Sequence, residues 1–215
     1  MQWNLVIPLK PLSRAKSRLA DTAGDGLRPG LALAFAQDTV AAALACAAVR
    51  DVAVVTDDSL AGRELAALGA RIITGEPAGG LNVALAYGAS AVRSRTPERP
   101  VAALNADLPA LRPPELARVL EAAAEFPRAF LPDAAAIGTT LLAVAPGREL
   151  LPDFGPDSRA RHRASGAAEL RLHGVDSVRQ DVDTGDDLRA ALALGVGSRT
   201  AALAARLLIP GQSGG

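Results

Sequence analysis

The stretch VAVVTDDSLAGRELAALGARIIT, residues 52–74, decides the fold. It begins with an apolar run at residues 52–55, continues with helical spacing over residues 59–68, and ends in a second apolar run at residues 71–74. Gly69, just before that second run, is typical of a helix C-terminus. Because two parallel strands need a crossover that is usually a helix, the stretch predicts a β–α–β unit.

The alternation of strands and helices continues on both sides of this stretch. Further strands are predicted at residues 5–7, 101–104, 129–131 and 140–144, with a strand-like piece at residues 175–178. Further helices are predicted at residues 31–49, 81–92, 115–125, 187–194 and 199–208. The pattern is typical of the α/β class and predicts a single domain, residues 1–210, with a mostly parallel sheet flanked by helices. A flexible tail is expected at residues 211–215.

Composition excludes several classes of partner. The 215 residues contain 23 Lys+Arg against 23 Asp+Glu, and 49% are hydrophobic, enough for a core. A zero formal charge provides no overall field for a nucleic acid polymer or an anionic membrane. No apolar run approaches the ~20 residues that span a bilayer, and no signal peptide is recognisable, so a cytoplasmic protein is expected. The single cysteine, Cys46, excludes a disulfide framework and is expected in the core.

The loop after the first strand is rich in basic residues. It holds the chain's only two lysines, Lys10 and Lys16, together with Arg14 and Arg18. Ammonium and guanidinium groups beyond a strand end can converge on a polyphosphate. The loop has no glycine, so it is neither a Walker A loop nor a dinucleotide-binding turn. The alternative interpretation is a solvated basic loop.

Carboxylates follow two of the predicted strands. Asp107 follows residues 101–104, and Asp181 and Asp183 follow residues 175–178. Parallel strands end at one edge of a sheet, where carboxylates can share a hard divalent cation such as Mg²⁺. Such an arrangement suits nucleotidyl transfer. The alternatives are a turn role for Asp107 and an N-cap role for Asp183 with Thr184.

Two further loops offer groups for small ligands. Gly80 and Asn82 open a helix, where backbone amides can approach a ligand and Asn82 can contact a base or a sugar; a plain helix-start turn is the alternative. Residues 138–140 and the loop at residues 152–166 offer hydroxyls, amides and basic groups for a second anion. His162 and His173 have no partner at catalytic or metal spacing, and residues 21–29 read as an insert-like loop without an assigned role.

Taken in order, these motifs resemble the GT-A-like nucleotidyltransferases, and more closely the guanylyltransferases of coenzyme F-420 biosynthesis that act on phosphoenolpyruvate or 2-phospho-L-lactate. The resemblance covers about residues 3–195 and rests on the segments at residues 6–10, 15–19, 80–82, 105–111, 138–142, 154–158 and 181–184. It implies four sets of site residues: Thr140, Gly155 and Ser158 for phosphoenolpyruvate; Asp107, Asp181 and Asp183 for Mg²⁺; Lys10, Lys16 and Arg18 for the GTP triphosphate; Gly80 and Asn82 for the guanine or ribose. Lys10, Lys16, Arg18 and Asp107 are then the catalytic residues.

The resemblance implies transfer of GMP from GTP to phosphoenolpyruvate, giving enolpyruvyl-diphospho-guanosine and pyrophosphate, with the product passed to a later biosynthetic enzyme. An acceptor phosphate oxygen attacks the α-phosphorus, so metal and basic groups must offset the repulsion between two polyanions. The open alternatives are 2-phospho-L-lactate, a sugar phosphate or a molybdenum cofactor precursor as acceptor, and a nucleotide-binding module without catalysis.

Overall fold

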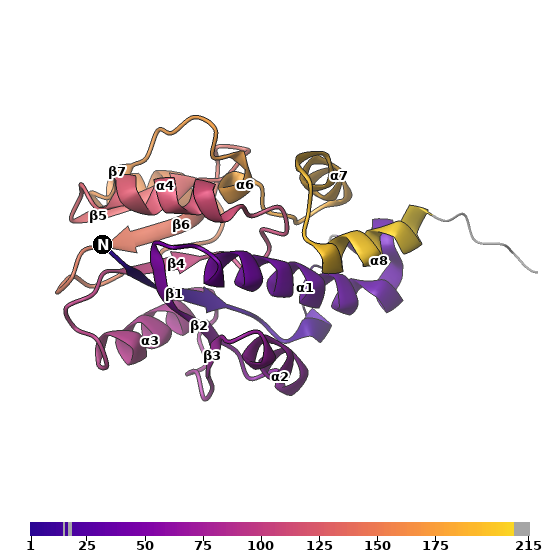
Figure 1. The fold of residues 1–215 in the computed structure, drawn as a ribbon, viewed down its shortest axis with the longest axis horizontal. Helices are drawn as coiled ribbons and strands as arrows, with labels where there is room; N and C mark the ends of the chain where they lie inside the picture. The colour runs from indigo at the N-terminus through magenta and orange to yellow at the C-terminus, as the bar shows by residue number, and fades with distance from the viewer. Residues whose placement is uncertain (15, 17–18, 209–215) are drawn as a thin grey trace, which may run out of the picture.

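A seven-stranded sheet forms the centre of the protein. The computed structural model describes residues 1–14, 16 and 19–208 (Figure 1). The strands lie in the order β3-β2-β1-β4-β6-β5-β7, and β6 runs antiparallel to its neighbours β4 and β5 while the other pairs are parallel. Their bounds are β1 Trp3–Pro8, β2 Val49–Val55, β3 Arg71–Ile73, β4 Val101–Leu104, β5 Arg128–Pro132, β6 Thr139–Val144 and β7 Ala168–Glu169. The predicted fold class, a mostly parallel sheet with flanking helices, is confirmed.

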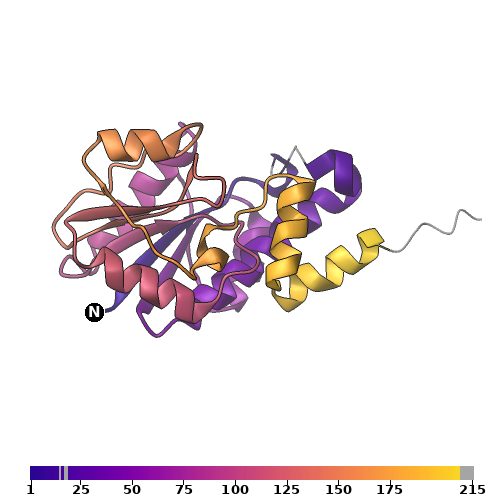
Figure 2. The ribbon, with the colours of Figure 1, turned by 90° about the horizontal axis from the view of Figure 1, so that it is seen from above.

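Helices cover both faces of the sheet. They are α1 Ala20–Leu44, α2 Ser59–Ala67, α3 Leu81–Arg93, α4 Pro113–Ala123, α5 Ser158–Ala164, α6 Asp176–Arg179, α7 Gly185–Leu194 and α8 Ser198–Leu208, with a 3-10 turn, η1, at Leu12–Arg14. One apolar cluster joins one face to α1, α2, α4 and α6, and a second joins the other face to α3 and the segment before α5. Figure 2 shows α4 and α5 on opposite faces. Helices α7 and α8 pack beside α1 at one end of the molecule (Figure 1).

Alternation along β1 divides the core between the two faces. Leu5 and Ile7 belong to the cluster under α1, whereas Val6 belongs to the cluster under α3. Helix α3 approaches the sheet closely at Gly88, where a Cβ atom would lie 2.5 Å from Val55 Cγ2 and 2.7 Å from Val6 Cγ1. A residue without a side chain is therefore required where α3 crosses the sheet.

Helix α1 differs from its prediction at both ends. It starts at Ala20, so the predicted insert-like loop at residues 21–29 is helical, with Pro29 inside the helix. It stops at Leu44, short of the predicted end at residue 49. Glycines and Pro29 disfavour a helix locally, but Leu31 and Phe35 bury their side chains in a cluster shared with α7. Tertiary packing thus overrides local propensity in this segment.

Two further predictions were wrong. The strand-like piece at residues 175–178 is the helix α6, since Val175 and Val178 are buried at a helical spacing of three rather than by alternation. The loop expected at residues 152–166 contains the helix α5, and the short edge strand β7 follows it.

Two other expectations concern burial and membranes. Cys46 is confirmed as a core residue, with 2% of its surface exposed. Among residues 1–14, 16 and 19–208, no helix has both the length and the apolarity to cross a membrane. The expected tail at residues 211–215 lies outside the described residues.

Candidate active site

Lys16 joins two carboxylates from distant parts of the chain. Its ammonium pairs with Asp107 Oδ2 and lies 2.8 Å from Asp183 Oδ1, across sequence separations of 91 and 167 residues. Only 12% of the Lys16 side chain is exposed. The backbone of Lys16 has a φ of 56°, in the left-handed region, so the loop turns sharply as it delivers this side chain. The structure thus brings together three of the predicted site residues.

Backbone hydrogen bonds hold the segments that carry these carboxylates. After β4 ends at Leu104, the Asn105 N–H donates to the Thr140 carbonyl at 3.0 Å. The Val182 N–H, between Asp181 and Asp183, donates to the Asp107 carbonyl at 3.1 Å. The position of Asp107 is therefore fixed by β6 on one side and by the segment before α7 on the other.

Burial and neighbouring charges shift the pKa values of two groups at the site. Burial lowers the pKa of Lys16, but the charges of Asp107 and Asp183 outweigh it, so the pKa of this ammonium is raised above its usual value. Burial, followed by the charges of Asp107 and Asp183, raises the pKa of Asp181 to about 8. The carboxylates that raise the pKa of Asp181 form the kind of environment that a divalent cation stabilises.

A metal ion fits some of these groups better than others. Asp107 Oδ1 is buried and has no hydrogen-bond partner among the described residues, so it is available to a cation. Among residues 1–14, 16 and 19–208, no group of three His, Cys, Asp or Glu side chains is arranged to hold a metal ion. The Lys16 ammonium lies between Asp107 and Asp183 instead. Asp107 and Asp183 could therefore hold a metal ion between them only if the Lys16 ammonium left that space.

Thr184 has the N-cap role that the sequence left open for it. Its hydroxyl accepts a hydrogen bond from the Asp187 N–H, and the Asp187 carboxylate accepts from the Thr184 N–H at 2.8 Å, which is a capping box at the start of α7. Asp183, one residue earlier, does not cap the helix through its side chain but pairs with Lys16.

The three predicted acceptor residues come from β6 (Thr140), from the turn before α5 (Gly155) and from the first residue of α5 (Ser158). Thr140 is fully buried in β6, and its hydroxyl has no hydrogen-bond partner among the described residues. Gly155 has a φ of 126°, which favours glycine, and its carbonyl accepts from the Ser158 N–H at 3.1 Å. A Cβ atom on Gly138 would lie 3.8 Å from Ser158 Oγ. The start of β6 and this turn therefore face each other.

The glycine turn at the start of α3 is partly as predicted. Gly80 is the N-cap with a φ of 83°, and a Cβ atom there would meet open space, so its backbone is accessible. The Asn82 amide, however, donates to the Phe154 carbonyl at 3.0 Å and accepts from the Phe154 N–H at 2.8 Å. The Asn82 side chain is thus engaged within the protein, and its contact with guanine or ribose stays a prediction.

Of the other basic side chains of the first loop, the structure describes only that of Lys10. Lys10 is exposed and makes no hydrogen bond or ion pair with any described residue. Arg18 lies outside the described residues, so the structure does not bear on its predicted role.

His162 is a buried residue beside the predicted acceptor residues, and sequence spacing did not identify its partners. Its ring is fully buried on α5, with Nδ1 at 3.0 Å from Thr139 Oγ1 and Nε2 accepting from the Asp153 N–H at 3.1 Å. Burial, followed by the charge of Arg128, lowers the pKa of His162 to about 4, so the ring is neutral at pH 7. Nothing in the sequence spacing distinguishes it from His173, which is exposed as expected.

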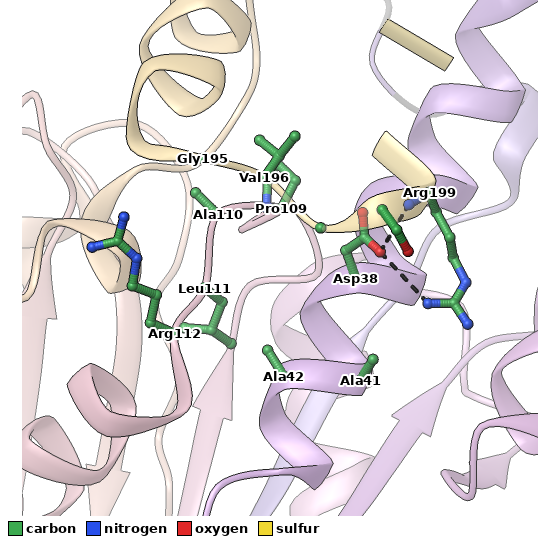
Figure 3. Close-up of a pocket in the computed structure, with 12 residues that line it drawn as sticks. Asp38, Ala41, Ala42, Pro109, Ala110, Leu111, Arg112, Gly195, Val196 and Arg199 are labelled. Atoms are coloured by element: carbon green, nitrogen blue, oxygen red, sulfur yellow. Dashed lines mark hydrogen bonds and ion pairs between the residues drawn. The ribbon is translucent and has the colours of Figure 1, made fainter. Parts of the chain in front are cut away.

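A pocket of about 320 Å³ lies away from this site (Figure 3). It is formed by α1, the loop after β4 and the connection between α7 and α8, and contains none of the predicted site residues. Asp38 at its wall caps α8, since it accepts from the Thr200 N–H at 2.8 Å, and it also pairs with Arg199. The Asp38 carboxylate on α1 therefore binds the first turn of α8 and stabilises the packing of α8 against α1.

Sequence comparison gives matches along the whole chain. The family described as "Guanylyl transferase CofC like" matches residues 3–209. A protein of Streptomyces avermitilis named phosphoenolpyruvate guanylyltransferase is 84% identical over 214 residues, covering 100% of this chain and 99% of the relative. A protein of Thermomonospora curvata with the same name is 62% identical, covering 96% of this chain and 90% of the relative.

Solved structures share the fold at low identity. A nucleotide-diphospho-sugar transferase-like protein from Desulfovibrio desulfuricans has a TM-score of 0.69 and 16% identity, covering 96% of this chain and 95% of its own. The Mycobacterium tuberculosis protein Rv0371c, solved as a complex with manganese, has a TM-score of 0.54 and 22% identity, covering 90% of this chain and 99% of its own. At these identities the likeness extends to the fold alone.

Proposed function

Because the chain belongs to the family of CofC-like guanylyl transferases, we propose that it transfers GMP from GTP to phosphoenolpyruvate. The products are enolpyruvyl-diphospho-guanosine and pyrophosphate, and the former is passed to a later enzyme of coenzyme F-420 biosynthesis. The family resemblance carried by the sequence motifs is confirmed by the match over residues 3–209. The choice of acceptor is supported by the names of relatives at 84% and 62% identity.

One structural observation carries the proposal: a buried ammonium lies between two carboxylates, Asp107 after the strand β4 and Asp183 between the helices α6 and α7. Nucleotidyl transfer brings two polyanions together, and its barrier depends on compensating charge. In this proposal Lys16 leaves the two carboxylates and contacts the triphosphate, where it stabilises the charge that develops on the α-phosphate and the leaving pyrophosphate. A flexible lysine is suited to such a change of partner.

Asp107 and Asp183 then hold the divalent cation, with Asp181 beside them. The unpartnered oxygen of Asp107 supports this assignment, and the manganese complex of Rv0371c is consistent with it. When bound, Mg²⁺ supplies positive charge that offsets the repulsion between the two phosphate groups. The nearby carboxylates hold the ion and contribute no proton to the transfer.

On the acceptor side, the proposal assigns phosphoenolpyruvate to Thr140, Gly155 and Ser158. The buried Thr140 hydroxyl can donate to a phosphate or carboxylate oxygen, and the open turn at Gly155 offers backbone N–H groups. The acceptor phosphate is ionised at neutral pH, so it needs no general base. These residues bind and orient the acceptor for in-line attack.

We also assign the reaction to the cytoplasm, where both substrates are made.

The deciding experiment is a pyrophosphate-release assay with purified protein, GTP and Mg²⁺. The acceptors are phosphoenolpyruvate, 2-phospho-L-lactate and a sugar phosphate, each in a separate reaction, and mass spectrometry identifies the nucleotide product. We expect release with phosphoenolpyruvate and a product mass that matches enolpyruvyl-diphospho-guanosine. A preference for another acceptor would contradict the assigned substrate, and no release with any acceptor would favour a nucleotide-binding module.

A further inference from the structure

We propose that Asn82 and His162 are positioning residues that hold residues 153–155 from two sides and thereby set the acceptor site relative to the nucleotide site. Neither residue is expected to touch a substrate. The inference rests on the proposed function only in naming what each side binds. The contacts themselves are independent of that function.

The first contact comes from α3. The Asn82 side chain uses both ends of its amide on one residue, donating to the Phe154 carbonyl at 3.0 Å and accepting from the Phe154 N–H at 2.8 Å. Two hydrogen bonds to one backbone unit fix its orientation as well as its distance. Because Asn82 lies two residues after the N-cap Gly80, the glycine turn and the Phe154 segment move as one unit.

The second contact comes from α5. Since the Asp153 N–H donates to His162 Nε2 at 3.1 Å, this nitrogen is an acceptor and the ring proton is on Nδ1. Nδ1–H therefore donates to Thr139 Oγ1 at 3.0 Å. The ring also packs edge-on against Phe154, with 5.1 Å between the ring centroids. His162 thus connects the Asp153–Phe154 segment to the first residue of β6.

Together the two side chains form a continuous path between the proposed subsites. The path runs from the glycine turn through Asn82, the backbone of residues 153–154 and His162 to Thr139. Two residues on the path are the immediate neighbours of proposed acceptor-binding residues: Thr139, at one end, precedes Thr140, and Phe154, in the middle, precedes Gly155. Loss of either side chain should displace the acceptor residues while leaving Lys16 and its carboxylates in place.

The test compares steady-state kinetics of Asn82→Ala, Asn82→Asp, His162→Leu and His162→Gln. We expect Asn82→Ala and His162→Leu to raise the KM for the acceptor about tenfold and the KM for GTP less than threefold, because each loses two hydrogen bonds to the acceptor side. Asn82→Asp should behave like Asn82→Ala, since its carboxylate cannot donate to the Phe154 carbonyl. His162→Gln can both donate and accept, so it should recover part of the loss.

Gln37→Ala is the matched control, because the Gln37 amide on the helix α1 also donates a hydrogen bond, to the Glu64 carboxylate on the helix α2. It should leave both KM values unchanged. An unchanged acceptor KM in Asn82→Ala and Asn82→Asp, or an equal rise in both KM values, would overturn the proposal. If His162→Leu fails to fold, the two Asn82 variants decide the outcome.

Hydrogen exchange separates this inference from the proposed function. In Asn82→Ala, peptides covering residues 150–157 should exchange at least fivefold faster than in the wild type, while peptides of β1 and β2 exchange at the wild-type rate. This measurement needs no substrate. Wild-type protein that is inactive with phosphoenolpyruvate would overturn the proposed function, whereas unchanged exchange at residues 150–157 would overturn the positioning role.

Discussion

At the scale of single residues, the two lysines of the first loop have different surroundings. Lys16 is buried between Asp107 and Asp183, whereas Lys10 is exposed and makes no hydrogen bond or ion pair with any described residue. The sequence analysis grouped them because they are the chain's only lysines. The structure separates them, and substitution can measure the difference.

We expect Lys16→Met to lower kcat about 100-fold, because the loss of one charge aimed at the reacting phosphates typically has an effect of this order. Lys10→Met removes the same charge from an exposed position, and its loss should be under tenfold. Pyrophosphate release at saturating GTP measures both. Equal losses in the two variants would contradict the special position of Lys16.

A second prediction at this scale concerns how the free energy of unfolding depends on pH through the buried His162. The pKa of its ring is about 4 in the folded protein, against 6.5 for an unperturbed histidine. Between pH 4 and pH 6.5 the unfolded chain therefore binds a proton that the folded protein does not bind. The stabilising contribution is therefore complete above pH 6.5 and is lost as the pH falls toward 4. Its full size is about 3 kcal/mol.

Urea unfolding at pH 7.5 and pH 5 tests this prediction. The free energy of unfolding should fall more between pH 7.5 and pH 5 in the wild type than in His162→Gln, since glutamine does not titrate at this position. Carboxylates contribute to both proteins and cancel in the comparison. The same pH dependence in wild type and variant would show that the ring is protonated at no cost.

At the scale of elements, the contact of α3 with the sheet sets how the glycine turn is presented. Gly88→Ala should destabilise the protein by about 1–3 kcal/mol, because the new Cβ would lie 2.5 Å from Val55 Cγ2 and 2.7 Å from Val6 Cγ1. Both contacts are with β-branched side chains, which have little freedom to turn away. Thermal unfolding measures the loss.

Gly62→Ala is the control on a neighbouring helix. Its Cβ would lie 3.6 Å from Ile72 Cγ2, which is ordinary contact, so the higher helix propensity of alanine should raise stability by about 0.5–1 kcal/mol. Effects of opposite sign at two helix glycines would identify close packing as the cause. Equal effects would point to backbone entropy instead.

Sequence reasoning succeeded with elements whose signal is local. The stretch at residues 52–74 contains a whole strand, helix and strand in its own pattern. That Asp107 and Asp183 lie close together was predicted from the apolar segment before each, although the second segment is the helix α6 and not a strand. The first part of α1 could not be found, since its burial depends on α7, more than 140 residues later. The pairing of Asn82 with Phe154 spans 72 residues and leaves no trace in local spacing.

At the scale of the whole molecule, the site ties the chain together. Lys16, Asp107 and Asp183 come from the first, middle and last parts of the sequence, so a ligand bound there stabilises all three. GTP with Mg²⁺ at 100 times its dissociation constant should raise the free energy of unfolding by about 2.7 kcal/mol. A thermal-shift assay should register this as a rise of a few degrees in Tm.

Chelation by EDTA should abolish most of that rise in Tm, and Asp107→Asn should have the same effect at saturating Mg²⁺. Asp186→Asn is the control, since Asp186 is 82% exposed and pairs only with Arg189 among the described residues. It should leave the rise unchanged. A full rise in the presence of EDTA would mean that the nucleotide binds without a metal.

The one reversed strand in the sheet has a consequence for how acceptor choice can change. Because β6 runs against β4, Thr139 and Thr140 enter the site at the beginning of a strand, directly after the short turn at residues 133–138. In an all-parallel sheet the same threonines would lie at the opposite edge. A change in the length of this turn would therefore shift both threonines relative to β4, while the parallel strands β1, β2 and β3 would keep their register.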